Sequence, residues 1–331
     1  MGTYFSQKDL QTLRDLRATL LGMEERAPGE AATAYWADRR TLELYDRVFA
    51  ARIGWKWEAV LDEVEARAGL PAPAAVLDWG TGTGVAARTV LRRLGPERRP
   101  TRVVLLDRDA GAREFAAEAL RGEFPGLAVE TTGELPSEAF DLVLASHVLD
   151  ELEDPEVAPL LAAAAAADHV LWVEPGSKAT SRRLSALRGA LLADHHVIAP
   201  CVHRGDCGVL AEGHERDWCH LFARPPAEVH TTGEWSEVHR ELRIDLRSLP
   251  YSFLALRRAA VEPPSGARLL GRPRFQKGRV LLDLCDAAGV ETAPMLQRSD
   301  KALFKALKDT AGELVLMERE DGSTIRRANP E

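Results

Sequence analysis

Apolar residues recur every three or four positions in the first part of the chain, which is the spacing of a helix that buries one face. The pattern covers residues 7–23 and again residues 33–68. Pro71 and Pro73 then interrupt it, as expected between elements. We therefore predict a helical N-terminal cap over residues 1–70.

Short runs of apolar residues alternate with helical stretches after this boundary. The predicted strands are 76–78, 102–107, 127–131, 140–146, 169–174 and 195–200, and the predicted helices are 85–94, 111–123, 157–167 and 178–192. Such alternation is typical of an α/β fold, in which helices cover both faces of a parallel sheet. We predict a doubly wound, Rossmann-like domain over residues 71–258.

The last third of the chain has a different pattern. Strand-like runs occur at residues 221–223, 251–256, 280–284 and 314–318, and a turn-forming Pro263-Pro264-Ser265-Gly266 segment separates the second from the third. Residues 199–221 are rich in cysteine, histidine and glycine. We interpret them as a metal-binding insertion and predict a small β-rich C-terminal extension over residues 259–331.

A glycine-rich turn follows the first predicted strand, with the sequence Asp78-Trp79-Gly80-Thr81-Gly82-Thr83-Gly84. Alternate glycines let a ligand approach the backbone closely. The spacing differs from the dinucleotide-binding Gly-x-Gly-x-x-Gly, and it lacks the Lys-Ser/Thr ending of a phosphate-binding loop. It is typical of methyltransferases that use S-adenosylmethionine, so we predict that the Rossmann-like domain is of the class I methyltransferase type. The predicted cofactor contacts are Asp78, Gly80, Thr81, Gly82 and Gly84.

Polar residues also end the second and fourth strands. Asp107, with Arg108 beside it, is placed to accept hydrogen bonds from both ribose hydroxyls of the cofactor, and Asp109 is the alternative. Ser146 and His147 face the same cleft. His147 is a candidate general base, and the alternative is a wall residue that contacts the cofactor.

Two methyl-transfer chemistries are disfavoured. Methylation of an exocyclic base amine relies on an Asp/Asn-Pro-Pro-aromatic segment after the fourth strand, where this chain has Ser146-His147-Val148-Leu149. Methylation of a pyrimidine at carbon 5 needs a cysteine nucleophile near these strand ends. No cysteine precedes Cys201.

All four cysteines lie in the second half of the chain, at Cys201, Cys207, Cys219 and Cys285. Four thiols can hold a structural zinc ion or an iron–sulfur cluster. His203, His214 and His220 are further possible zinc ligands. The alternative is four unrelated buried thiols, which behave as small apolar side chains.

Composition is that of an ordinary globular protein, with 45% hydrophobic and 28% charged residues. The longest apolar tract, residues 157–167, is shorter than the ~20 residues of a membrane helix. No secretory signal is evident, so we expect a cytoplasmic protein. A net charge of −8 argues against binding nucleic acid by bulk electrostatics.

Five segments together resemble one known family. They are Val76 to Gly84, Val173-Glu174-Pro175-Gly176, Ala199-Pro200-Cys201-Val202-His203, Asp217-Trp218-Cys219-His220 and Leu282-Asp283-Leu284-Cys285. The resemblance is to the methyltransferase-like small-ribosomal-subunit assembly family, and it spans about residues 35–290. It implies a 4Fe-4S cluster held by Cys201, Cys207, Cys219 and Cys285. Four thiolates would close the cluster, which indicates a structural or sensing role.

The same resemblance implies a role with the small ribosomal subunit or its RNA. The chain lacks the basic extensions of mitochondrial members. A local basic run offers candidate RNA contacts at Arg268, Arg272, Arg274, Lys277 and Arg279. Three functions stay open: an rRNA methyltransferase, a non-catalytic assembly factor with a structural metal site, and a small-molecule methyltransferase, which the segment 147–152 also resembles.

Overall fold

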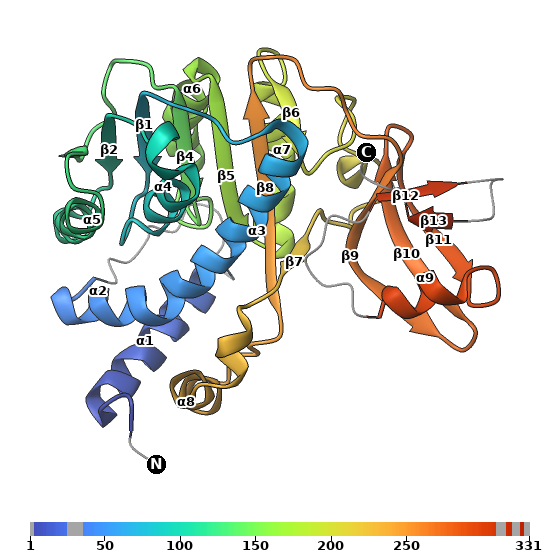
Figure 1. Ribbon diagram of the computed structural model, residues 1–331, viewed down its shortest axis with the longest axis horizontal. Coiled ribbons are helices and arrows are strands. Elements are labelled where there is room, and N and C mark those ends of the chain that lie inside the picture. Colours follow the sequence, from blue (N-terminus) through green and yellow to red (C-terminus); the bar gives the residue numbers. More distant parts are fainter. Residues whose placement is uncertain (1–2, 25–35, 309–315, 320–324, 328–331) are drawn as a thin grey trace.

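The computed structural model describes residues 3–24, 36–308, 316–319 and 325–327. Its centre is an eight-stranded sheet (Figure 1). The strands are β1 (Ala75–Trp79), β2 (Arg102–Leu106), β3 (Ala128–Thr132), β4 (Leu142–Ser146), β5 (His169–Pro175), β6 (His196–Ala199), β7 (Leu221–Ala223) and β8 (Leu249–Arg257). The predicted α/β class is therefore confirmed.

The strand order is β3-β2-β1-β4-β5-β8-β6, and β7 pairs with the first half of β8. Strands β1 to β5 pair in parallel. Strand β8 runs antiparallel to both of its long neighbours, β5 and β6. The predicted parallel pairing is thus confirmed for β1 to β5, and the strand-like run at 251–256 is the antiparallel strand β8, whose direction a continuous apolar run does not indicate.

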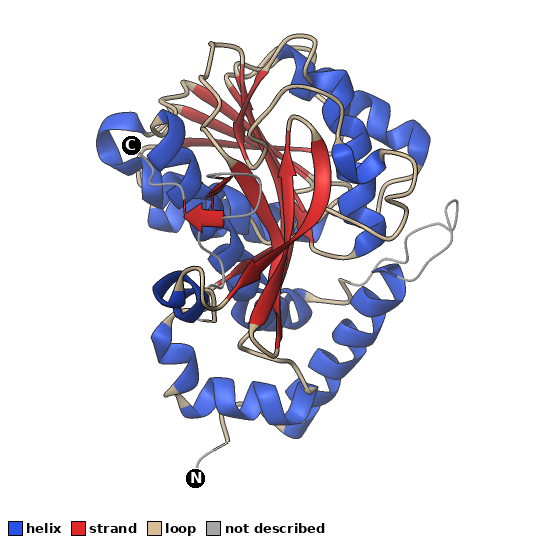
Figure 2. Ribbon diagram, turned by 90° about the vertical axis from the view of Figure 1, so that its right-hand side faces the viewer, coloured by secondary structure: helices blue, strands red, loops and turns tan. Residues whose placement is uncertain are grey.

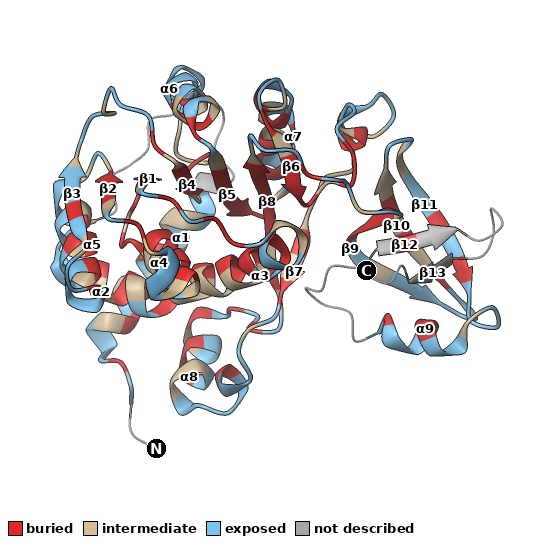
Figure 3. Cartoon of the chain, turned by 45° about the horizontal axis from the view of Figure 1, so that its top comes forward, coloured by how far each residue is buried: buried red, intermediate tan, exposed pale blue. Residues whose placement is uncertain are grey.

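Helices cover both faces of this sheet (Figure 2). One apolar core joins the sheet to α3 (Ala51–Ala68), α4 (Val85–Arg98) and α5 (Ala110–Glu123), and another joins it to α6 (Asp154–Ala166) and α7 (Lys178–Leu191). Val76 packs in the first core and Leu77 in the second, because successive strand residues point to opposite faces. The central strands are buried, whereas β3 at the edge is largely exposed (Figure 3).

The predicted N-terminal helices are confirmed as α1 (Gln7–Glu24) and a longer run made of α2 (Arg39–Tyr45), η1 (Asp46–Ala50) and α3. The run begins at Arg39 rather than at residue 33, and residues 33–35 lie outside the described ranges. The segment η1 is one π-helical turn. Such turns occur mostly as single insertions in α-helices, often at functional sites.

A second sheet follows, with five strands in the order β11-β10-β9-β12-β13 (Figure 1). They are β9 (Ala267–Gln276), β10 (Arg279–Asp286), β11 (Gly289–Leu296), β12 (Leu316–Arg319) and β13 (Ile325–Arg327), with α9 (Lys301–Ala306) packed beside them. The run at 280–284 is confirmed as β10. Of the run at 314–318, residues 314–315 lie outside the described ranges.

A buried ion pair joins the two halves. Arg268 on β9 donates to both carboxylate oxygens of Glu63 on α3, at 2.5 and 3.0 Å. Both residues are less than a tenth exposed. Between β7 and β8 of the first sheet in chain order lie η3 (Ala227–His230) and α8 (Gly233–Leu242), which complete the α/β half. Within the described ranges, no helix combines the length and the apolar character needed to cross a membrane.

Candidate functional site

The glycine turn after β1 is held against the end of β2. The N–H of Gly80 donates to the carbonyl of Leu106 at 2.8 Å. Gly80, Gly82 and Gly84 have φ angles of 64°, 50° and 78°, a conformation that residues with side chains rarely adopt. A Cβ on Gly80 would also stand 2.4 Å from Cγ1 of Val148. Glycine is required here both for conformation and for contact.

Two carboxylates brace this turn. Asp78 is fully buried, and it accepts a hydrogen bond from the Thr81 hydroxyl at 2.9 Å; burial raises the pKa of Asp78 to about 7. Asp107 accepts hydrogen bonds from the N–H groups of Gly82 and Asp109, each at 2.9 Å. Burial raises the pKa of Asp107 as well. Asp107 reaches the cleft described next, whereas Asp78 lies behind the turn.

A cleft of about 750 Å³ opens at the carboxyl ends of β1, β2 and β4. The strand order reverses between β1 and β4, and this reversal is where doubly wound sheets bind ligands. The predicted residues that line the cleft are Gly80, Thr81, Gly82, Asp107, Arg108, Asp109, Ser146 and His147. Nothing lies within 4 Å of a Cβ placed on Gly82. The open backbone and the volume fit a nucleoside-sized cofactor.

Ser146 and His147 end β4 at the cleft, and α3 engages both. Ser146 Oγ accepts a hydrogen bond from Trp57 Nε1 at 2.9 Å, and Lys56 Nζ lies 3.3 Å from His147 Nε2. His147 has a φ of 56°, which is unusual for a residue with a side chain. Burial first, and then the charge of Lys56, hold the pKa of His147 well below its usual value. Its imidazole is therefore neutral at pH 7.

A second cavity, of about 550 Å³, adjoins the cleft. Tyr45, Ile53, His147 and Glu151 line both spaces. The sequence does not predict this cavity, because its walls come from α1, η1, α3, the loops after β4 and β5, and residues 243–250. Helical periodicity was the available signal for the first three, and it does not show which polar side chains turn inward.

The four cysteines line a single small cavity of about 30 Å³. Cys201 follows β6, Cys207 precedes the short helix η2 (Gly208–Leu210), Cys219 precedes β7, and Cys285 lies on β10. All four are partly buried free thiols. The structure thus brings together residues that are widely separated in the sequence.

Burial raises the pKa values of Cys201, Cys219 and Cys285, the last to about 12, and neighbouring thiols add to the effect. His203 also lines the cavity, with Nε2 at 3.9 Å from Cys285 Sγ. Among the described residues, no group of three or more His, Cys, Asp or Glu side chains is arranged as a metal-ion site. The ligand role of the cysteines therefore stays a prediction.

The other two histidines considered as zinc ligands do not line the cavity. His214 Nδ1 lies 2.7 Å from the Asp217 carboxylate, and His220 stacks on the ring of Trp218. Both have partners within the insertion. His214 and His220 therefore contribute to the packing of the insertion and not to the lining of the cavity.

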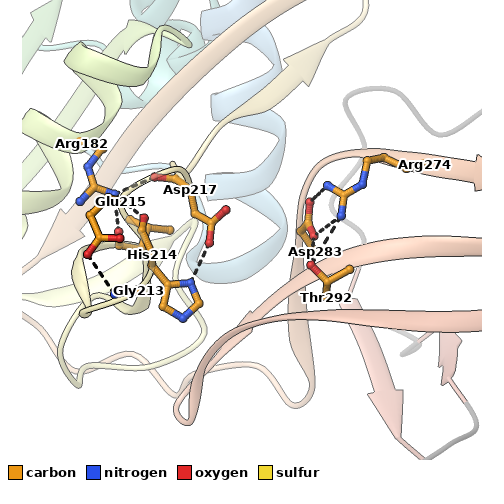
Figure 4. Close-up of polar contacts among 9 residues, drawn as sticks. Arg182, Gly213, His214, Glu215, Asp217, Arg274, Asp283 and Thr292 are labelled. Atoms are coloured by element: carbon orange, nitrogen blue, oxygen red, sulfur yellow. Dashed lines mark hydrogen bonds and ion pairs between the residues drawn. The ribbon is translucent and has the colours of Figure 1, made fainter.

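The insertion is anchored to α7 and to the second sheet. Arg182 on α7 donates to the carbonyls of His214 and Asp217 at 2.9 and 2.7 Å (Figure 4). On the other side, Gly208 lies so close to β11 that its Cβ would stand 2.8 Å from Gly289 Cα. Gly271 on β9 donates its N–H to the carbonyl of His220 at 2.9 Å. These contacts place Cys285 beside the three cysteines of the insertion.

Buried guanidinium groups surround the cysteines. Arg188 on α7 is 4% exposed, and it donates to the carbonyls of Gly205 and His203 at 2.9 and 2.8 Å. Arg67 donates to the carbonyl of Cys201 at 3.3 Å. Arg268, with its partner Glu63, adds a further charge nearby. This is a positive environment for thiolates.

The basic run predicted to contact RNA is largely engaged within the protein. Arg268 is buried in its ion pair and is not available for RNA. Arg274 binds Asp283 across β9 and β10 (Figure 4), and Arg272 lies over the Phe222 ring. Arg279 donates to the Gln276 amide oxygen at 2.6 Å. The run does not form one free basic face.

The strand order, the antiparallel strand β8 and the glycine turn at the switch point define the chain as a class I methyltransferase-like protein. More particularly, the chain belongs to the family described as mitochondrial small ribosomal subunit Rsm22, whose profile matches residues 48–312. The resemblance seen in the sequence is therefore confirmed. No protein of curated function matches the sequence.

The solved structures that this chain resembles include methyltransferases. Magnesium protoporphyrin IX methyltransferase from Synechocystis, with bound S-adenosylmethionine, is 12% identical, with a TM-score of 0.39 over 78% of this chain and all of that chain. The plantazolicin methyltransferase BamL is 11% identical, with a TM-score of 0.41 over 76% and 100%. A proposed RNA methyltransferase from Pyrococcus horikoshii is 13% identical, with a TM-score of 0.39 over 74% and 98%.

Proposed function

We propose that this protein is an S-adenosylmethionine-dependent methyltransferase that acts on RNA of the small ribosomal subunit in the cytoplasm. The observation that carries the proposal is the contact between Asp107 and the Gly82 N–H, at the switch point of the sheet. It holds a bare backbone turn and a ribose-binding carboxylate in one cleft. Membership of a family named for the small ribosomal subunit supports the choice of partner.

The residues of this chain would divide the work as follows. Gly80 to Gly82 receive the amino-acid part of the cofactor on their backbone, and Asp107 accepts the ribose hydroxyls with the lone pairs that its two N–H contacts leave free. When bound, the cofactor supplies an electrophilic methyl group on a sulfonium. His147, being neutral at pH 7, can accept a proton from the methyl acceptor.

We also propose that Cys201, Cys207, Cys219 and Cys285 hold a 4Fe-4S cluster, with zinc as the alternative. The donor set supports this, since four thiols share one cavity that contains just one histidine. Arg188, Arg67 and Arg268 would offset the negative charge of the thiolates. A closed cluster in this place would join the insertion to the second sheet and leave methyl transfer to the other cleft.

One observation favours a second function, a non-catalytic assembly factor. Lys56 lies within hydrogen-bond distance of the ring nitrogen of His147 that faces it. A base engaged in this way has to lose that contact before it takes a proton from an acceptor. Cofactor binding without methyl transfer is the expected behaviour of such a protein.

Calorimetry with S-adenosylhomocysteine tests the cofactor site. Asp107→Ala is expected to weaken binding by about tenfold or more, because hydrogen bonds to a charged group are lost. Asp168→Ala is the matched control, since Asp168 lies at the opposite end of the same sheet, and it is expected to bind normally. Absence of binding by the wild-type chain would refute the proposal.

Transfer of a labelled methyl group from S-adenosylmethionine to small subunits from a deletion strain separates the two functions. Label in the RNA supports the enzyme, and binding without label supports the assembly factor. For the cysteines, anaerobic purification followed by visible absorption and metal analysis decides the ligand. A colourless protein with stoichiometric zinc would exclude the iron–sulfur cluster.

A further inference from the structure

The second cavity meets the cofactor cleft at His147. It extends from that residue toward α1 and the segment 243–250. The π-helical turn η1 shapes the boundary, because Tyr45 precedes the turn and Phe49 lies on it, and their rings are 5.7 Å apart. An acceptor in this cavity would lie beside any cofactor bound in the cleft.

Three arginines line the cavity: Arg17 from α1, Arg52 from α3 and Arg243 from the loop after α8. In the part of the chain that the structure describes, none of them forms an ion pair, and Arg52 Nε is buried without a hydrogen-bond partner. The fourth cation, Lys56, is occupied at His147.

The carboxylates that line the same cavity are already engaged. Asp150 accepts from the Thr180 hydroxyl, Glu151 accepts from Arg108 at 3.1 Å, and Asp245 accepts from Arg247 at 3.0 Å. Four cationic side chains, the three arginines and Lys56, thus line the cavity with three carboxylates, so positive charge is in excess.

The position of Arg52 in this cavity changes the pKa of its guanidinium group. Burial first, and then repulsion from Arg17, lower the pKa of Arg52 to about 10, while Asp245 opposes this in part. Arg52 still carries its charge at pH 7. An anion in the cavity would offset both the desolvation and the repulsion.

We propose that the second cavity is the methyl-acceptor site and that it binds a nucleotide, with the phosphate at Arg17, Arg52 and Arg243 and the base toward His147. This inference rests on the proposed function, and it specifies the acceptor class. A volume of about 550 Å³ is adequate for one nucleotide, within the range of small-molecule pockets. Enzymes that modify a base commonly take it into such a pocket, beside aromatic side chains.

Binding measurements on the full chain test the site with three probes: cytidine 5′-monophosphate, cytidine, and a short single-stranded oligoribonucleotide. Arg52→Gln and Arg17→Gln are expected to weaken binding of the nucleotide by about tenfold or more, with little change for cytidine. The matched control is Arg240→Gln, on exposed α8 and paired with Glu241, which is expected to bind as the wild type. Arg17 lies on a different helix from Arg52, so one misfolded variant does not decide the outcome.

S-adenosylhomocysteine is titrated in parallel and is expected to bind both variants within about twofold of the wild type. Loss of this ligand with retained nucleotide binding would overturn the inference, because the arginines would then serve the cofactor carboxylate. Equal nucleotide and RNA binding by all variants, or no binding by the wild type, would also overturn it. Arginine-dependent binding of the oligoribonucleotide but not of the free nucleotide identifies a nucleotide within RNA as the acceptor.

Failure of the proposed function has a different signature. The nucleotide could bind in an Arg52-dependent way while S-adenosylhomocysteine does not bind to the wild-type chain. That result would support the anion site and refute the proposed methyltransferase function. The two results come from separate titrations of the same preparation.

Discussion

Gly208 and Gly289 lie in direct contact across the boundary between the insertion and the second sheet, where a Cβ on Gly208 would stand 2.8 Å from Gly289 Cα. Gly289 begins β11 and pairs with Asp286, next to Cys285. The close approach of these two glycines therefore brings the fourth cysteine to the other three.

Gly208→Ala is expected to push the insertion away from the second sheet. Backbone atoms of Gly289 and Val290 cannot yield as a flexible side chain would, so we expect a loss of about 1–3 kcal/mol in the free energy of unfolding. Denaturant unfolding measures it. Gly189→Ala, on α7 beside the same cavity but with nothing within 4 Å, should instead stabilise the protein by about 0.5–1 kcal/mol. Equal effects of the two substitutions would contradict the packing argument.

Glu63→Ala is expected to destabilise the fold by about 3–5 kcal/mol, because it leaves the buried guanidinium of Arg268 without its partner. Thermal or urea unfolding gives the value. The control is Glu130→Ala, which breaks an exposed pair with Arg102 on β2 and should cost at most about 1 kcal/mol. A small effect at Glu63 would mean that the two halves are not coupled through this pair.

Glu174 should make stability depend on pH. Burial raises its pKa from 4.5 to about 8, so the folded state keeps a proton that the unfolded state releases. Its contribution is fully present below pH 4.5 and is lost as the pH rises toward 8. Glu174→Gln removes this titration. The free energy of unfolding of the variant, relative to the wild type, should therefore increase between pH 5 and 8, and a constant difference would refute the assignment.

Lys56→Met should raise the pKa of His147, because the substitution removes the positive charge that lies 3.3 Å from Nε2. Burial remains, so the pKa is expected to stay below 6.5. Proton NMR of the histidine ring over a pH series measures the change. Lys301→Met, on α9 of the second sheet, serves as the control and should leave His147 unchanged. An unchanged value in Lys56→Met would show that burial and the charge of Arg52 set the pKa without Lys56.

Much of the α/β half was predictable because its elements carry strong local patterns. Strands β1 to β5 and helices α4 to α7 follow from short apolar runs that alternate with stretches of helical spacing. The direction of β8 and its place between β5 and β6 did not follow, since both depend on contacts made far along the chain. In the second sheet, β9 and β11 were missed. Gly271 and Pro273 interrupt the first, and Pro294 interrupts the second.

The candidate site also has a part that the sequence predicts and a part that it does not. The cleft residues adjoin their strands in sequence, so the turn at Gly80 and the carboxylate of Asp107 could be located by counting. The arginines around the cysteines could not be located in this way. The helices that carry Arg188 and Arg67 have no local sequence pattern showing that these side chains turn toward the cysteines. The sequence likewise predicts Arg268 at the surface, as a candidate RNA contact, whereas the structure buries it in an ion pair with Glu63.

The position of Cys285 in the sequence also determines which of the two sites can form first while the chain is synthesised. The ribosome completes the last strand of the first sheet, at Arg257, before it reaches the residues of β10. A nascent chain at that stage already has every residue that lines the cofactor cleft, but only three of the four thiols. Completion of the cysteine cavity therefore reports that the chain has been made as far as β10 and that this strand has docked beside the insertion.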